Sequence, residues 1–207
     1  MAKVYLFVTA ICILSQLGSL VLLPWHLLGV NVERLATMCV ERWVALLVVS
    51  ALIGPVTIVG AEHLTPPPPS HSHQGKQRQG FVYIANHSSQ IDGAAVYFMS
   101  RRFRLILKQS IIFLPGLGLL TVMARHIFID RDKRKNKTNV QEMYDKCFKT
   151  LQAGNSIFIF PQGTRRMDRR LPFKDGAFNI AIQSEVPIIP ISIHIPNHAW
   201  NSAYPLN

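Results

Sequence analysis

Two long uncharged stretches dominate the first third of the chain. One runs from Val4 to Val30 and is rich in Leu, Val and Ile; the other runs from Trp43 to Ala61. Each is long enough to cross a bilayer as a helix, so the pattern predicts a hairpin of two membrane helices with both ends on one side. Pro24 leaves a bent or re-entrant segment as an alternative, and the length of the first run argues against a signal peptide.

A segment of quite different composition follows. Residues 66–80 begin with four consecutive prolines and continue with Ser, His, Gln, Gly, Lys and Arg, with no apolar residue that could enter a core. Such a segment is typical of a linker. We therefore expect a membrane anchor over residues 1–65, a linker over 66–80 and a folded domain over 81–207.

Beyond the linker, short β-prone runs alternate with helical patterns. Strands are predicted over residues 81–85, 105–107, 127–129, 157–160 and 188–195. Helices are predicted over residues 94–99, 140–153 and 177–184. The apolar stretch 111–123 contains Pro115 and Gly116, which argue against a simple helix. Alternating strands and helices predict an α/β fold, expected here as a mixed sheet flanked by helices.

Composition and charge narrow the possible partners. Only 16% of the residues are charged and the mean hydropathy is +0.21, which favours contact with lipid. The net charge of +11 lies entirely beyond the second apolar run and suits anionic partners such as phospholipid headgroups, phosphorylated metabolites and CoA. A basic stripe interleaved with aromatic residues is absent from the sequence, so no nucleic-acid partner is expected. The three cysteines are far apart and form no CxxC pair, so neither a disulfide framework nor a metal site is expected.

The sequence NHSSQIDG, which follows the predicted strand 81–85, is the first candidate site. His87 and Asp92 are five positions apart, close enough for the carboxylate to accept the Nδ1 hydrogen and leave Nε2 free as a general base. The same spacing also fits a turn residue and a helix N-cap, so the motif is not decisive alone.

The sequence FPQGTRR, which follows the predicted strand 157–160, is the second candidate. Gly163 would let the backbone approach a ligand, and Thr164 and Arg165 are suited to phosphate oxygens. A surface turn with solvated arginines is the alternative.

Four ordered stretches together resemble a known family. NHSSQID, FIDR (128–131), FPQGTRR and VPIIPI (186–191) resemble, in order and spacing, the four blocks of the glycerolipid acyltransferase superfamily, and most closely its 1-acylglycerol-3-phosphate acyltransferase branch. The resemblance extends from about residue 81 to residue 194, and Lys108 and the stretch 171–178 add to it.

The resemblance implies roles for individual residues. His87 would be the general base and Asp92 its orienting partner, with direct attack of the acceptor hydroxyl on acyl-CoA and no acyl-enzyme. The acceptor phosphate would be bound by residues of the second and third blocks and, less directly, by a lysine after them: Arg131, Gly163, Thr164, Arg165 and Lys174. Pro187 and Pro190 in the fourth block would contact acyl-CoA or shape the core. Acyl-CoA is a co-substrate, and no cofactor is implied.

Gln162 departs from the family pattern, in which this position of FPEGTR is glutamate. The amide keeps the shape but loses the charge. The leading hypothesis is acyl-CoA-dependent acylation of lysophosphatidic acid to phosphatidic acid. The alternatives are a catalytically impaired or regulatory lipid-binding homologue, and an acyltransferase acting on another lysophospholipid or on glycerol-3-phosphate.

The expected setting is a membrane. The basic excess beyond the hairpin predicts a cytosolic domain at the endoplasmic reticulum, with a plastid or bacterial inner membrane as the alternative. The expected partners are acyl-CoA, a lysophospholipid acceptor and the bilayer. Members of the family often continue past the fourth block, so the chain is interpreted as a fragment or a short form.

Overall fold

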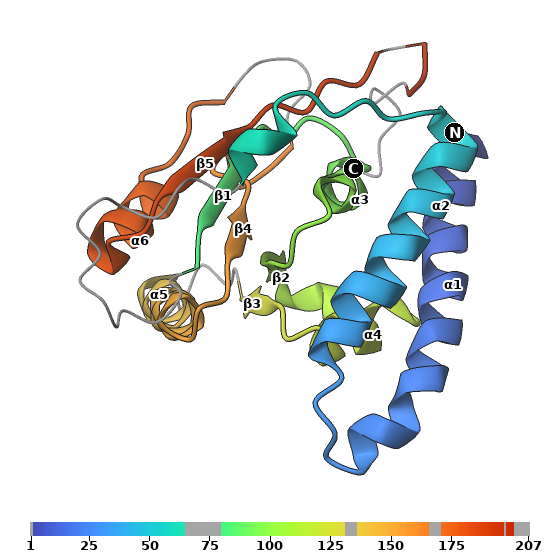
Figure 1. Ribbon diagram of the computed structural model, residues 1–207, viewed down its shortest axis with the longest axis horizontal. Helices are drawn as coiled ribbons and strands as arrows, with labels where there is room; N and C mark the ends of the chain where they lie inside the picture. Colours follow the sequence, from blue (N-terminus) through green and yellow to red (C-terminus); the bar gives the residue numbers. More distant parts are fainter. Residues whose placement is uncertain (1, 65–79, 131–135, 166–170, 197, 201–207) are drawn as a thin grey trace.

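The computed structural model describes residues 2–64, 80–130, 136–165, 171–196 and 198–200. Its centre is a five-stranded sheet with the strand order β3-β2-β4-β1-β5. The strands are β1 (Val82–Ala85), β2 (Arg104–Lys108), β3 (Ile127–Ile129), β4 (Ile157–Ile159) and β5 (Ile188–Ile191). Helices lie on both sides of this sheet, as Figure 1 shows.

All four pairings of the sheet are parallel. β1 lies between β4 and β5, with Ile84 beside Ile159 and Pro190, and β2 joins β4 to β3. The α/β class is confirmed, whereas the sheet that was expected to be mixed is parallel throughout the described strands. Parallel neighbours require crossover connections, and the helices between these strands supply them.

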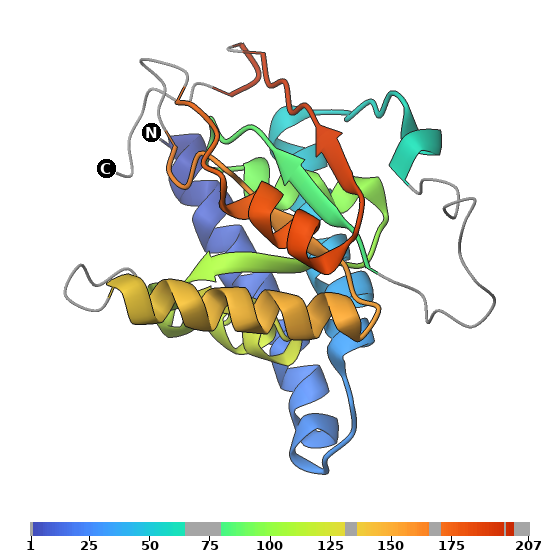
Figure 2. The ribbon, with the colours of Figure 1, turned by 90° about the vertical axis from the view of Figure 1, so that its left-hand side faces the viewer.

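The two faces of the sheet bury different side chains because successive residues of a strand point to opposite sides. Val82 and Ile84 of β1 pack against α5 (Asn136–Gln152) and α6 (Gly176–Ser184), where Cys147 is fully buried. Burial raises the pKa of the Cys147 thiol to about 12, so this thiol is an uncharged core residue. In Figure 2, α5 and α6 lie in front of the sheet.

The opposite face carries the remaining short helices. Tyr83 and Ala85 of β1 pack there with residues of η3 (Val96–Met99), with Ala45 and with Leu64 of η2 (Ala61–Leu64). The short helix α3 (Asp92–Ala95) precedes η3 directly. This face of the sheet is therefore covered by α3 and η3 and, further out, by the N-terminal helices (Figure 1).

The N-terminal apolar runs form the predicted hairpin. α1 (Ala2–Leu27) is one helix with Pro24 near its end, and the returning arm consists of η1 (Leu35–Glu41), which has π-helical hydrogen bonding, and α2 (Arg42–Ile53). Two helical segments, 3–27 and 35–53, are long and apolar enough to cross a membrane. The chain stays helical through Pro24, which removes only one backbone N–H donor close to the end of α1.

The hairpin packs directly on the α/β domain. The segment between β2 and β3 folds into η4 (Gln109–Phe113) and α4 (Leu117–Met123), and Gly116 between them rests on α1. A Cβ on Gly116 would lie 2.4 Å from the Cys12 carbonyl oxygen and 2.5 Å from the Gln16 backbone nitrogen. The Ser19 hydroxyl also donates to the Gly116 carbonyl at 3.2 Å. The break that Pro115 and Gly116 predicted is thus a docking point for α1.

A partly buried ion pair also connects the hairpin to the α/β domain. Glu33, in the turn of the hairpin, accepts hydrogen bonds from Nε and Nη2 of Arg104 at 2.9–3.1 Å. Arg125 approaches the same carboxylate at 3.8 Å. Residues 66–79 of the predicted linker (66–80) lie outside the described residues.

The close contact at Gly116 generates a stability prediction. Gly116 and Gly29 both have positive φ, 72° and 78°, but a Cβ on Gly29 would meet nothing within 4 Å. Gly29→Ala should therefore lose about 1 kcal/mol of unfolding free energy from left-handed strain alone. Gly116→Ala adds a backbone clash and should lose about 3 kcal/mol, measured by chemical unfolding in detergent. Equal losses in the two variants would contradict the docking of α1 on Gly116.

Candidate active site

His87 and Asp92 form a hydrogen-bonded pair at the carboxyl end of β1. The His87 Nδ1 lies 2.9 Å from the Asp92 Oδ2, and the same oxygen accepts the backbone N–H groups of Ser88 and Ser89 at 2.7 Å each. Asp92 is fully buried, whereas 20% of the His87 side chain is exposed. A carboxylate only accepts hydrogen bonds, so this arrangement places the ring hydrogen on Nδ1.

The free edge of the His87 ring faces open space. The ring stacks on Phe160 with centroids 4.2 Å apart, which fixes its plane. Among the described residues, no group hydrogen-bonds to Nε2 of His87. The ring is thus held by one nitrogen and one face, and its other nitrogen is available as a base.

The second candidate site lies beside the first because β4 is the neighbour of β1. Parallel neighbours end at the same edge of a sheet, so the turn after β4 emerges next to the turn after β1. Gly163 has φ 72°, a left-handed conformation that favours glycine, and its N–H donates to the Phe160 carbonyl at 2.9 Å. A Cβ on Gly163 would lie 3.1 Å from Nζ of Lys174, so this lysine packs against the turn.

Gln162 connects the two turns. Its Oε1 accepts the backbone N–H of His87 at 2.5 Å, and its Nε2 donates to the Leu171 carbonyl at 3.2 Å. The residue that departs from the family pattern therefore touches the backbone of the candidate base.

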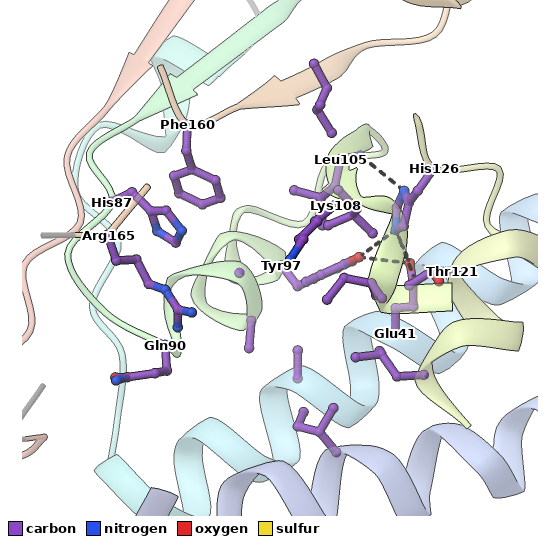
Figure 3. A pocket seen from close by; sticks show the side chains of 18 of the residues that line it. Glu41, His87, Gln90, Tyr97, Leu105, Lys108, Thr121, His126, Phe160 and Arg165 are labelled. Atoms are coloured by element: carbon purple, nitrogen blue, oxygen red, sulfur yellow. Dashed lines mark hydrogen bonds and ion pairs between the residues drawn. The ribbon is translucent and has the colours of Figure 1, made fainter. Parts of the chain in front are cut away.

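A cavity of about 470 Å³ opens in front of these turns. It lies between the end of the sheet and the hairpin, and its walls come from β2, β4, α3, η3, α4 and both arms of the hairpin. His87, Gly163, Thr164 and Arg165 all line it, and Figure 3 shows His87 and Arg165 side by side at one end. The two motifs that the sequence separates by about 75 residues thus share one cavity.

Two cations face this cavity without a carboxylate partner. Arg165 and Lys108 both line it, and neither forms an ion pair with any residue that the structure describes. Lys108 is the last residue of β2, and it lies between the two ends of the cavity in Figure 3. A guanidinium and an ammonium that line one cavity with a free imidazole nitrogen are suited to an anionic ligand such as a phosphate.

Polar side chains also close the other end of the cavity. Glu41 of the hairpin accepts the Tyr97 hydroxyl at 2.8 Å and lies 3.1 Å from Nε2 of His126 (Figure 3). The Leu105 N–H donates to Nδ1 of His126, so Nε2 carries the hydrogen and donates to Glu41. Burial, together with the Glu41 carboxylate, raises the pKa of Tyr97 well above its ordinary value. Both nitrogens of His126 are engaged, so this cluster is fixed structure rather than a second base.

Much of the cavity lining is apolar. These side chains come from the hairpin, from β2 and from the segment between β2 and β3: Phe7, Ile11, Val44, Leu105, Leu107, Ile111 and Leu117. The apolar stretch 111–123 supplies only part of this lining, through Ile111 and Leu117, since Leu120 is completely buried in the core.

The remaining predicted site residues lie elsewhere. Arg131 lies outside the described residues. Lys174 is next to Gly163 but does not line the cavity. Pro187 directly precedes the edge strand β5 and Pro190 lies within it, where a residue without an N–H is tolerated, and neither lines the cavity. Their contact with acyl-CoA stays a prediction.

Several cavity residues were not predicted as site residues. Glu41 stands at the edge of an apolar run and His126 at the start of a strand, so each resembled an ordinary boundary residue in the sequence. A lone acid beside a membrane-length apolar run is a signal that could have identified Glu41. Lys108 was noted only as part of the family resemblance.

The chain matches a known protein family. The sequence profile of the family described as Acyltransferase matches residues 56–194. The chain belongs to the Acyltransferase family. The match includes both turns that carry His87 and Arg165 and begins after the end of the hairpin.

Individual relatives carry more specific names. The 1-acyl-sn-glycerol-3-phosphate acyltransferase of Limnanthes douglasii is 32% identical over 181 residues, covering 86% of this chain and 58% of the relative. The enzyme of the same name from Haemophilus influenzae is 37% identical over 119 residues, covering 56% of this chain and 48% of the relative. The chain spans about half the length of the curated relatives that it matches.

A solved structure has the same fold. The crystal structure of the 1-acyl-sn-glycerophosphate acyltransferase PlsC from Thermotoga maritima superimposes with a TM-score of 0.56 at 20% identity, over 86% of this chain and 72% of that chain. At this identity the likeness concerns the fold. The superposition covers 86% of this chain. The sequence match to the 1-acyl-sn-glycerol-3-phosphate acyltransferase of Chlamydomonas reinhardtii covers 139 residues, or 67% of this chain.

Proposed function

We propose that the protein transfers an acyl group from acyl-CoA to the free hydroxyl of lysophosphatidic acid and so forms phosphatidic acid. The observation that carries the proposal is the shared cavity, in which a free imidazole nitrogen lies beside a guanidinium that pairs with no carboxylate of the described residues. The names of the relatives from Limnanthes douglasii and Haemophilus influenzae support the choice of acceptor.

His87 acts as the general base in the proposed reaction. Its Nε2 takes the proton of the acceptor hydroxyl while the hydroxyl oxygen bonds to the thioester carbonyl carbon. The Asp92 carboxylate stabilises the imidazolium through the 2.9 Å contact with Nδ1. The C–S bond then breaks, and the CoA sulfur takes the proton from Nε2, which returns His87 to its starting state. The residues required are thus a base and an orienting carboxylate, without a nucleophilic side chain.

Arg165 binds the phosphate of the acceptor in this proposal. A guanidinium matches phosphate oxygens with paired N–H donors, and Lys108 adds a second positive charge to the same cavity. Gly163 and Thr164 offer the turn backbone and a hydroxyl beside it. We also assign Arg131 and Lys174 to phosphate binding, on the family resemblance. Anchoring the phosphate fixes the distance of the reacting hydroxyl from His87.

The apolar part of the cavity lining is suited to an acyl chain. Its aliphatic walls come from α1, α2, β2 and the segment 111–117, and they end at the polar cluster of Glu41, Tyr97 and His126. Burial of methylene groups contributes about 0.8 kcal/mol for each group that leaves water, so such a wall binds an acyl chain without specific contacts. We expect no cofactor beyond the co-substrate acyl-CoA.

The hairpin associates the enzyme with a membrane in this account. Its outward face exposes large apolar side chains, among them Leu17, Val21, Trp25, Trp43 and Leu47. We propose that this face enters the bilayer and that the basic domain faces the cytosol at the endoplasmic reticulum, or the corresponding side of a plastid or bacterial inner membrane. Membrane contact would place the cavity where both lipid substrates partition.

Substitution of the two cavity residues tests the proposed chemistry. His87→Ala should lower kcat by about 100-fold to 10,000-fold, since it removes a general base. Arg165→Ala should raise KM for lysophosphatidic acid by about 10-fold to 100-fold, the equivalent of one charge-assisted hydrogen bond. Rates are measured with radiolabelled oleoyl-CoA and protein in lipid vesicles.

The controls for this experiment are a remote arginine and alternative acceptors. Arg102 is exposed and bonds to Asn155 away from the cavity, so Arg102→Ala should keep wild-type KM. Monoacylglycerol, which lacks the phosphate, should be acylated at rates that do not depend on Arg165. A wild-type protein that acylates glycerol-3-phosphate or another lysophospholipid faster than lysophosphatidic acid would contradict the proposed acceptor.

Tryptophan fluorescence tests the membrane face. Trp25 and Trp43 are 56% and 62% exposed on the hairpin, whereas Trp200 is 2% exposed and packs on Phe7. In variants that keep one tryptophan and replace the others by phenylalanine, brominated lipids should quench Trp25 and Trp43 strongly and Trp200 weakly. Equal weak quenching at all three positions would show that the hairpin does not enter the bilayer.

A further inference from the structure

Gln162 makes two hydrogen bonds of opposite polarity. Its Oε1 accepts the His87 N–H, and its Nε2 donates to the Leu171 carbonyl. The side chain therefore bridges the turn after β1, the turn after β4 and the segment that leads into α6. Its surroundings offer one backbone donor on one side and one backbone acceptor on the other.

Only an amide satisfies both partners at neutral pH. The N–H of His87 requires an oxygen and the carbonyl of Leu171 requires an N–H, so a single orientation of the amide fits. An ionised carboxylate of the same shape could accept from His87, but its second oxygen would face the Leu171 carbonyl oxygen. Two acceptors in contact repel and leave a partly buried group unpaired.

A matching clamp holds the other side of His87. The Asn86 Oδ1 accepts the Ile193 N–H at 2.8 Å, and the Asn86 Nδ2 donates to the Ile193 carbonyl at 2.8 Å. This amide extends the pairing of β1 with the chain after β5 by one residue. The residue before His87 is thus tied to the chain after β5, and the N–H of His87 is tied to the turn after β4.

We propose that Gln162 is a positioning residue whose amide sets the place of His87 relative to the phosphate-binding turn. This inference rests on the proposed function, because the base and the phosphate site must act on one acceptor molecule. Gln162 directly precedes Gly163, Thr164 and Arg165, so one side chain fixes the base and the start of the turn that carries the guanidinium. The chain is then a competent enzyme in which the amide replaces the family's carboxylate, rather than an impaired homologue.

Two substitutions distinguish the effect of the two hydrogen bonds of Gln162 from the effect of the space that its side chain fills. Gln162→Met keeps the length and makes neither hydrogen bond, and it does not titrate. Gln162→Glu keeps the acceptor for His87 and loses the donor for Leu171 while the introduced carboxyl is ionised. Both should lower kcat by about 10-fold to 100-fold at alkaline pH, with KM for acyl-CoA unchanged.

The pH dependence of the Gln162→Glu variant is the decisive readout. A protonated carboxyl both accepts and donates, so it restores the pattern of the amide. Burial against the Leu171 carbonyl favours the protonated form and raises the pKa of the introduced carboxyl, whereas Arg165 and Lys174 near the turn oppose this shift. On the β1 side, His87 and Asp92 are further ionisable groups near this position. The carboxyl is protonated below its raised pKa, so recovery must come as pH falls.

The measured quantity is the ratio of variant to wild-type kcat in vesicles, from about pH 8 down to about pH 6, which cancels the ionisations that both proteins share. The ratio for Gln162→Glu should rise about 10-fold over this range, and the ratio for Gln162→Met should stay constant. A Gln162→Glu variant that equals or exceeds wild type at every pH overturns the inference. A deficit of Gln162→Glu that does not change with pH, or wild-type kcat in Gln162→Met, overturns it as well.

The thermal unfolding midpoint of the same purified proteins separates this inference from the proposed function. A wild-type protein that transfers no acyl group would reject the proposed function by itself. The Gln162→Glu variant should then still unfold at a lower temperature than wild type at alkaline pH, and the difference should shrink as pH falls. Unfolding midpoints that match wild type at every pH would reject the two-bond role of Gln162 whatever the activity is.

Discussion

The site depends on one carboxylate oxygen that accepts three hydrogen bonds. Oδ2 of the buried Asp92 takes the backbone N–H groups of Ser88 and Ser89 and the Nδ1 hydrogen of His87. The two backbone bonds curl the chain tightly after β1, and the third fixes the tautomer of the imidazole. Because the carboxylate has no hydrogen to give, the other ring nitrogen is left bare, and it faces the cavity. The chemistry proposed for His87 follows from this geometry.

The order of the strands brings the two cations of the cavity to the same edge of the sheet as His87. β4 lies beside β1 and β2 lies beside β4, so the turn that holds Arg165 and the strand end that holds Lys108 meet at the same edge of the sheet as His87. The hairpin supplies the facing wall, docked through Gly116 and tied by Glu33 to Arg104. The hairpin is therefore part of the cavity as well as an anchor, and a change in its packing should alter the space available to an acyl chain.

Local patterns in the sequence identified most of the elements. β3 matches its predicted range of 127–129, and β1, β2, β4 and α6 agree within one residue at each end, because short apolar runs bounded by Gly, Pro or polar residues leave little choice. β5 stops at Ile191, whereas the apolar run continues to Ile195, since pairing with β1 ends there and Asn86 takes over. The parallel pairing and the π-helical turn that directs Glu41 to Tyr97 depend on contacts between distant segments, which no local pattern contains. In the sequence, Gln162 could be interpreted only as the loss of the family's negative charge. Its two hydrogen-bond partners, His87 and Leu171, come from other segments and are known only from the folded chain.

The tautomer of His87 tests the account most directly. Nitrogen-15 NMR of the imidazole groups, compared between wild type and His87→Ala in buffer alkaline enough to keep the ring neutral, assigns the proton of this residue. The account predicts a protonated Nδ1 hydrogen-bonded to Asp92 and an unprotonated Nε2. A proton on Nε2 would contradict it, since the nitrogen that faces the cavity would then have no lone pair to accept the proton of a lipid hydroxyl.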